Sequence, residues 1–211
     1  MNRASWAAAA AFAGIALLGV NLAGATTVQK FTVSDLAKKS ESIVLARVED
    51  ETARMDEGTK EIYTYITLRV TEDVKGSKRN DNAKNPKGSE EFITIRQLGG
   101  TVGNLISVVP GMPTFRKGEE VVVFLSAKDR AGYPWVMGLQ QGKYTVTTGE
   151  DGFKQVRNDM DGLTVMEQDG TKIEAKGSTQ QPLASFLDGI KTQLDLEGKV
   201  RVNEAIPTPT E

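Results

Sequence analysis

Apolar and polar residues alternate most clearly between Glu61 and Val74. The even-numbered positions are mostly apolar and include Ile62, Thr64, Ile66, Leu68, Val70 and Val74. The odd-numbered positions carry Tyr63, Tyr65, Thr67, Arg69 and Thr71. A period of two is typical of an antiparallel strand with one buried face. The stretch is long for one strand, so we expect it to bend, as strands do in a small barrel.

Other apolar runs predict further strands. Ile43 to Val48 is nearly continuous in apolar residues, and Glu91 to Leu98 alternates. Val121 to Leu125 is wholly apolar, which favours a central strand buried on both faces. Shorter strands separated by glycine-containing turns are predicted at Trp135–Leu139, Lys143–Thr147 and Phe153–Arg157. Gly76 to Ser89 has no large apolar residue and is predicted to be a solvated loop.

Two helices are expected at the ends of this strand region. Ser34 is a plausible N-cap for a short helix near the N-terminus. Pro182 suits the first position of a second helix, and Gly198 its end. The second helix has one apolar face, formed by Leu183, Phe186, Leu187, Ile190 and Leu194. The tail from 199 to 211 is polar and rich in proline, and we expect it to be disordered.

This order of elements predicts a mainly β protein. Five or more coiled antiparallel strands with a Greek-key return are typical of an OB-like barrel. The short N-terminal helix and the amphipathic C-terminal helix would flank that barrel. Residues 26–198 are long enough for one domain with a core of its own.

The first 25 residues have the pattern of a secretory signal peptide. Arg3 gives a short positive region, the run from Trp6 to Val20 is apolar, and Ala23-Gly24-Ala25 is a small-x-small cleavage site. We therefore predict cleavage after Ala25. An alanine-rich apolar run behind a minimal positive region is typical of bacteria, which places the mature protein in the periplasm or outside the cell. No second apolar run is long enough to span a bilayer.

Composition excludes several kinds of chemistry. The chain has no cysteine and no histidine. A disulfide, a thiol nucleophile, an imidazole base and a zinc site made from protein nitrogen or sulfur ligands are therefore all excluded. The net charge of −2, about −3 without the leader, gives no sign of a nucleic-acid or anionic-membrane partner. No cofactor is predicted.

Three parts of the chain resemble the netrin and tissue-metalloprotease-inhibitor type of OB barrel. They are Ser42–Val48, the strand end Val74-Lys75-Gly76, and the motif Phe115-x-x-Gly118-Glu-Glu-Val-Val-Val-Phe-Leu125. The stretches Ile95–Gly100 and Trp135–Tyr144 are similar to a set of uncharacterised exported bacterial proteins. The resemblance covers roughly Ser42 to Tyr144 and implies the fold. The animal inhibitors chelate zinc through an N-terminal cysteine, which this chain lacks, so that mechanism does not transfer.

Paired carboxylates are the remaining route to catalysis. A glycosidase needs two carboxyl groups flanking a cleft, one of them with a raised pKa. The candidate pairs are Glu49 with Glu51, Glu90 with Glu91, Glu119 with Glu120, and Asp159 with Asp161. The segment from Asn158 to Gly162 also faintly resembles a calcium loop. Aligned as an EF-hand, its first ligand position falls on Arg157 and its twelfth on Gln168, so the motif fails, and an Asp-Gly turn is the default interpretation.

Two further features raise binding hypotheses. Tyr63 and Tyr65 project from the polar face of the longest strand, where OB folds stack bases or sugars. The interpretation we favour is that the C-terminal helix covers this face, because its apolar stripe needs a surface. The irregular segment Gly99–Gly118 is too long and too apolar for a connector. It either packs on the barrel end as a flap or displays an apolar contact site.

We expect this segment and the turn at 141–144 to form a protein-binding edge. The predicted binding residues are Gly99, Gly100, Pro110, Gly111, Met112, Pro113, Phe115, Gln141, Lys143 and Tyr144. The sequence thus favours an exported, non-enzymatic binding module, with a partnership with or inhibition of an extracellular protease as one hypothesis for its role. The alternative is a carboxylate-based hydrolase that cleaves glycans.

Overall fold

The structure is a computed structural model that describes residues 27–76, 91–160 and 163–204. From residue 197 onward it describes the backbone alone. The predicted leader and nearly all of the predicted loop at 76–89 lie outside the described residues. So do Glu90, Asp161 and the last seven residues of the predicted tail, 205–211.

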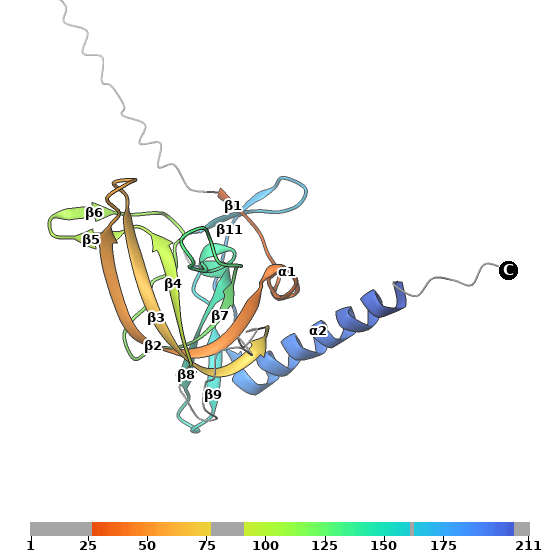
Figure 1. The fold of residues 1–211 in the computed structure, drawn as a ribbon. Helices are drawn as coiled ribbons and strands as arrows, with labels where there is room; N and C mark the ends of the chain where they lie inside the picture. Colours follow the sequence, from red (N-terminus) through yellow and green to blue (C-terminus); the bar gives the residue numbers. More distant parts are fainter. Residues whose placement is uncertain (1–26, 77–90, 161–162, 205–211) are drawn as a thin grey trace, which may run out of the picture.

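The described residues form a mainly β protein built on one large antiparallel sheet (Figure 1). The strand order in this sheet is β12-β9-β8-β7-β2-β3-β4. The strands are β2 (Ser42–Met55), β3 (Ile62–Lys75), β4 (Glu91–Leu98), β7 (Glu120–Leu125), β8 (Lys143–Thr148), β9 (Lys154–Arg157) and β12 (Gln181–Pro182). Strand β7, which contains the apolar run Val121–Leu125, lies in the middle of the sheet, as predicted.

Strands β2 and β3 are long and bent. The predicted alternation in β3 is confirmed, because Ile62, Thr64, Ile66 and Leu68 are buried while the odd-numbered residues between them are half-exposed. β2 continues well past Val48, since its charged second half pairs with β3 as far as Met55. Three register shifts interrupt this pairing, and such irregularities bend a strand pair. The pair therefore curves strongly across the molecule (Figure 1).

The smaller elements lie around this sheet. β5 (Gly100–Val102) and β6 (Leu105–Ser107) form a separate hairpin. β1 (Thr27–Gln29), β10 (Thr164–Met166) and β11 (Lys172–Glu174) form a three-stranded sheet, in which β1 runs parallel to β10. The short 3-10 helix η1 (Leu139–Gly142) leads directly into β8.

Two hydrophobic cores lie on opposite faces of β2 and β7. Alternate residues such as Ile43 and Phe124 face the helices. Their neighbours, such as Val44 and Val123, face the inside of the curved sheet together with Ile66 and the other core residues of β3 and β4. Burial on both faces explains why β7 and the first half of β2 read as nearly continuous apolar runs.

The two α-helices, α1 (Val33–Lys39) and α2 (Leu183–Glu204), pack together on the first of these cores. Thr32 caps α1 in place of the predicted Ser34. Its hydroxyl accepts from the Asp35 N–H, and the Asp35 carboxylate accepts from the Thr32 N–H, which makes a capping box. Four residues of the predicted apolar face of α2 are buried, namely Leu183, Phe186, Leu187 and Ile190, and the fifth, Leu194, is partly buried. α2 does not end at Gly198, because a glycine inside a helix costs only about 1 kcal/mol relative to alanine.

The described strands do not close into a hydrogen-bonded barrel, since β4 and β12 are the two ends of the sheet order. The predicted strand at Trp135–Leu139 is not formed. Only a single bridge joins Val136 to Leu125 of β7, and η1 follows. Pro134 has no N–H to donate, but its carbonyl accepts from the Arg96 N–H of β4 (3.0 Å). This segment therefore links β4 to β7 by isolated hydrogen bonds.

Tyr144 on β8 lies in the core beneath α2 and provides a test of this packing. Its ring centroid is 4.6 Å from that of Phe186 and 5.9 Å from that of Phe124. Burial raises the pKa of Tyr144 from 10.0 to about 12. Between pH 10 and 12 the unfolded chain loses this proton while the folded protein keeps it, so stability falls as pH rises.

We expect the wild type to lose about 2 kcal/mol of stability relative to Tyr144→Phe between pH 9 and pH 12. The variant cannot titrate in either state, so it serves as the internal reference for every other alkaline effect. Urea denaturation of both proteins at the two pH values measures the difference. An unchanged difference would mean that the hydroxyl reaches solvent.

Candidate functional site

The predicted binding segment and the predicted turn do lie together. The Gln140 N–H donates to the Gly111 carbonyl (2.9 Å), and the Lys143 ammonium donates to the Thr114 carbonyl (2.6 Å). The same ammonium lies 4.8 Å from the centroid of the Phe115 ring. The second half of Gly99–Gly118 is therefore folded onto the turn that leads into β8.

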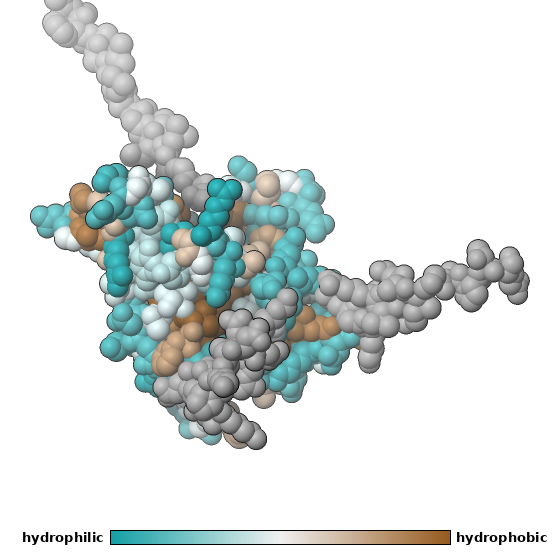
Figure 2. Space-filling model, viewed as in Figure 1, coloured by the Kyte–Doolittle hydropathy of each residue, from teal (hydrophilic) through white to brown (hydrophobic). Residues whose placement is uncertain are grey.

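The first half of the segment projects as the β5–β6 hairpin (Figure 1). Leu105, Ile106 and Val108 are 55%, 72% and 78% exposed. Figure 2 shows apolar side chains gathered on this projecting hairpin beside hydrophilic neighbours. The predicted apolar display is thus present, but other residues than Met112 and Phe115 form it.

Gly99 and Gly100 hold the hairpin against β2 and β3. Both have positive φ angles, of 101° and 133°. A Cβ on Gly100 would come within 2.4 Å of the Thr64 hydroxyl and 2.9 Å of the Ala53 Cβ. The Thr64 hydroxyl donates to the Gly99 carbonyl (2.7 Å). These glycines therefore position the hairpin through their backbone and offer no side chain to a ligand.

Several other predicted binding residues face inward. Phe115 is 3% exposed and lies in the core inside the curved sheet, and Tyr144 is 4% exposed beneath α2. Gln141 is also buried, and its amide accepts from the Phe31 N–H (2.8 Å) and donates to the Gln29 carbonyl (2.9 Å). Gln141 thus anchors the N-terminal segment. The packing of Phe115 therefore favours a structural role in the core over a role as a contact residue for a partner.

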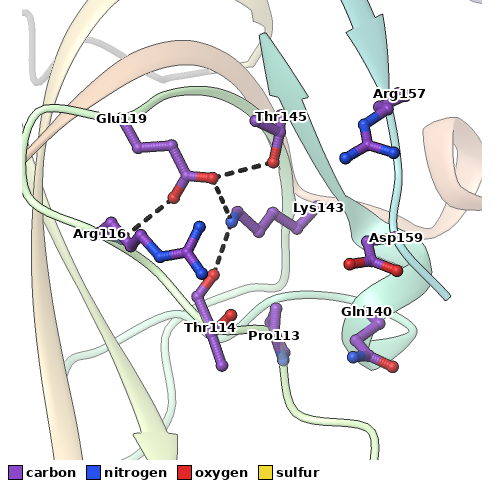
Figure 3. Close-up of a pocket in the computed structure, with 9 residues that line it drawn as sticks. All are labelled: Pro113, Thr114, Arg116, Glu119, Gln140, Lys143, Thr145, Arg157 and Asp159. Atoms are coloured by element: carbon purple, nitrogen blue, oxygen red, sulfur yellow. Dashed lines mark hydrogen bonds and ion pairs between the residues drawn. The ribbon is translucent and has the colours of Figure 1, made fainter. Parts of the chain in front are cut away.

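A polar pocket of about 140 Å³ lies where the segment meets β8 and β9 (Figure 3). Two of the predicted residues, Pro113 and Lys143, line it. The complete lining is Pro113, Thr114, Arg116, Glu119, Gln140, Lys143, Thr145, Arg157 and Asp159. Lys143 and Thr145 share one face of β8, and Thr145 lies directly opposite Arg157 of β9. The sheet register therefore places three of these side chains side by side.

Glu119 and Lys143 form a largely buried ion pair at the pocket wall. Their side chains are 14% and 11% exposed, and the Lys143 ammonium donates to the Glu119 carboxylate at 2.8 Å. The same carboxylate accepts from the Thr145 hydroxyl (2.9 Å) and the Arg116 N–H (3.0 Å). Desolvation lowers the pKa of Lys143 even though Glu119 opposes that shift. The pair thus fastens the loop before β7 to β8.

Two arginines reach toward the pocket from opposite sides. Arg116 comes from the loop before β7 and Arg157 from the end of β9, and Lys143 runs between them (Figure 3). Neither guanidinium group has an ion pair or a hydrogen bond with any residue in the described part of the chain. Guanidinium groups in this state can bind an oxyanion with two parallel hydrogen bonds. Nothing in the sequence indicated that these two arginines would line one pocket, since isolated arginines at strand ends are ordinary surface residues.

Several of the acidic residues that were predicted to act in pairs form ion pairs with separate cations. Glu49 pairs with Arg69 (2.7 Å), and Glu120 pairs with Lys154 (2.8 Å) on the side away from Glu119. Desolvation raises the pKa of Glu51, and nearby Glu119 adds to that effect. The pocket contains Glu119 and Asp159, one from each of two pairs. Asp161 and Glu90 lie outside the described residues.

The predicted cover over Tyr63 and Tyr65 is wrong. The apolar face of α2 packs against residues such as Leu36 and Leu45, around the other end of the sheet. Tyr65 instead meets Tyr133 edge to face, with ring centroids 5.2 Å apart. Tyr63 makes a cation–π contact, because the Arg96 guanidinium lies 4.4 Å from its ring centroid. The tyrosine face is therefore partly covered by the side chains of Arg54, Arg96 and Tyr133 and stays half-exposed.

Among the described residues, no group of three acidic side chains could hold a metal ion. Within the same ranges, neither helix is long and apolar enough to cross a bilayer. Compared with protein-family models, with the curated proteins and with the solved structures, the chain matches none of them. The function of this protein must therefore be inferred from its own geometry.

Proposed function

We propose that this protein is an exported, non-enzymatic binding module whose β5–β6 hairpin contacts a protein partner. The observation that carries the proposal is the exposure of Leu105 and Ile106 on one projecting hairpin and of Val108 directly after it. Single exposed apolar residues are normal, whereas a cluster on a projection is typical of an interaction surface. Burying such side chains against a partner would gain roughly 25 cal/mol per Å² of apolar surface.

The hairpin is also held in place before any partner arrives. The Gly99 N–H donates to the Ile62 carbonyl (2.7 Å), and Thr64 fixes the Gly99 carbonyl. Gly100 lies in close contact with Thr64 and Ala53. A preformed contact surface loses less conformational entropy on binding, which supports a binding role for a hairpin of this kind.

For the scaffold we propose an OB-like domain of the netrin and tissue-metalloprotease-inhibitor type. The bent β2–β3 pair and the link from β4 through Pro134 to β7 support it. We also propose that the leader at 1–25 directs export of the protein. An extracellular protease is one class of partner that it would then meet. Any inhibition would differ from that of the animal inhibitors, because the chain has no cysteine. Glu119, the best-placed acid of the alternative glycan-cleaving hydrolase, is engaged by three donors.

The test replaces Ile106 with aspartate and compares it with Phe153→Asp. Phe153 is 71% exposed and lies in the turn between β8 and β9, away from the hairpin. Both variants are expected to melt like the wild type, because surface substitutions usually change stability by less than about 0.5 kcal/mol. A partner captured by the wild type should be kept by Phe153→Asp and lost by Ile106→Asp.

A photo-reactive amino acid in place of Ile106 identifies the contact directly. A cross-link from this position to the captured protein would support the proposal. Two outcomes would count against the proposal. One is equal capture of the partner by the wild type, Ile106→Asp and Phe153→Asp, and the other is cross-links only between copies of the chain itself. The second outcome would mean that the hairpin mediates self-association.

A further inference from the structure

We propose that the pocket between Arg116 and Arg157 binds a small oxyanion, either a carboxylate or a phosphate-type group. The pocket is formed by the loop 113–119, η1, β8 and β9, and it does not include the β5–β6 hairpin. The proposal therefore holds whether or not the hairpin binds a protein partner.

Charge is unbalanced around this pocket. Lys143, Arg116 and Arg157 contribute three positive charges to the lining, and Glu119 and Asp159 contribute two negative ones. Glu119 is already engaged by Lys143, the Thr145 hydroxyl and the Arg116 N–H. The guanidinium groups of Arg116 and Arg157 have no carboxylate partner among the described residues. An oxyanion would supply the missing acceptor.

Arg116 lies beside another cation. Its guanidinium group is adjacent to the Lys143 ammonium in Figure 3. Desolvation is the main cause of the lowered pKa of Lys143, and the charge of Arg116 adds to it. Two like charges that lie side by side favour an anion between or beside them. Asp159, the other carboxylate of the lining, is exposed, and its charge acts in the opposite direction by raising the pKa of Lys143.

Size and donor geometry limit the ligand. The pocket volume of about 140 Å³ is well above the roughly 10–15 Å³ that a single water needs on the same measure. That is enough for one oxyanion group with a few attached atoms. Two guanidinium forks offer paired donors that match carboxylate and phosphate oxygens, and the Gln140 amide adds a further donor.

The experiment titrates the purified protein with sodium phosphate and separately with sodium acetate, at constant ionic strength maintained with chloride. Arginine side-chain NMR signals and the melting temperature report binding. At least one of the two anions should shift the signals of Arg116 and Arg157 and raise the melting temperature. Arg116→Gln and Arg157→Gln should each weaken that binding about tenfold, because each removes a charge-assisted pair of donors.

Arg130→Gln is the matched control, since Arg130 is an exposed arginine outside the pocket and the charge change is the same. It should bind like the wild type. Binding of phosphate alone would identify a phosphate-type ligand, and binding of acetate would identify a carboxylate. Failure of both anions to bind would overturn the proposal. Equal weakening by all three substitutions would also overturn it, because it would show only a general effect of charge.

Discussion

Replacing Lys143 with methionine is expected to lower the free energy of unfolding by about 3–5 kcal/mol. The side chains of Lys143 and Glu119 are 11% and 14% exposed and pair at 2.8 Å. Methionine keeps most of the volume but leaves the Glu119 carboxylate without its cation. It also removes the donor to the Thr114 carbonyl. Urea denaturation at neutral pH measures the loss.

Lys154→Met is the matched control for this prediction. Lys154 pairs with Glu120 at the same 2.8 Å, but its side chain is 49% exposed. Exposed pairs contribute about 0–1 kcal/mol, so this variant should be almost as stable as the wild type. Adding Glu119→Gln to Lys143→Met should restore part of the loss, because it removes the stranded charge. Similar small losses from Lys143→Met and Lys154→Met would show that the inner pair is solvated in solution.

Phe115→Ala is expected to cost about 3–5 kcal/mol, as truncation of a buried aromatic side chain does. Phe115 is 3% exposed and packs with the residues inside the curved sheet. Its ring also lies against the Lys143 ammonium, so truncation removes a cation–π contact as well. Thermal and urea unfolding measure the change.

Phe153→Ala provides the comparison for Phe115→Ala. Phe153 is 71% exposed, so its truncation should leave the melting temperature nearly unchanged. The two substitutions remove the same atoms, so the difference between them reports the burial of Phe115 together with its contact to the Lys143 ammonium. If Phe115→Ala melts like the wild type but loses a binding partner, Phe115 is a contact residue and the core packing described above is wrong.

Strand patterning was predictable because burial acts on each position of a strand separately. In β3 the alternation alone identified the buried residues from Ile62 to Leu68. Continuous apolar runs likewise identified β7 as central, since only a strand covered on both faces needs them. The apolar face of α2 was predictable from its spacing for the same reason.

Pairing partners were less predictable. The apolar face of α2 showed that the helix must pack against another surface. It did not show which surface: the helix packs against α1 and the first core, whereas Tyr63 and Tyr65 were the expected contact. Trp135–Leu139 has strand-like residues, but Pro134 and the positive φ of Gly138 limit it to a single bridge. Neither outcome is visible in local hydrophobicity, because both depend on which surfaces remain free after the rest of the chain has folded.

The sequence by itself determined that this chain is mainly β, that two helices accompany the sheet, and that Gly99–Gly118 is too apolar to be a plain connector. Only the tertiary structure decided which side chains of that segment face outward, turning Leu105, Ile106 and Val108 to solvent and Phe115 into the core. It also brought Arg116 and Arg157 to one pocket through the order β7-β8-β9. Polar residues carry no periodic signal of their own, so their meeting depends on strand order and register.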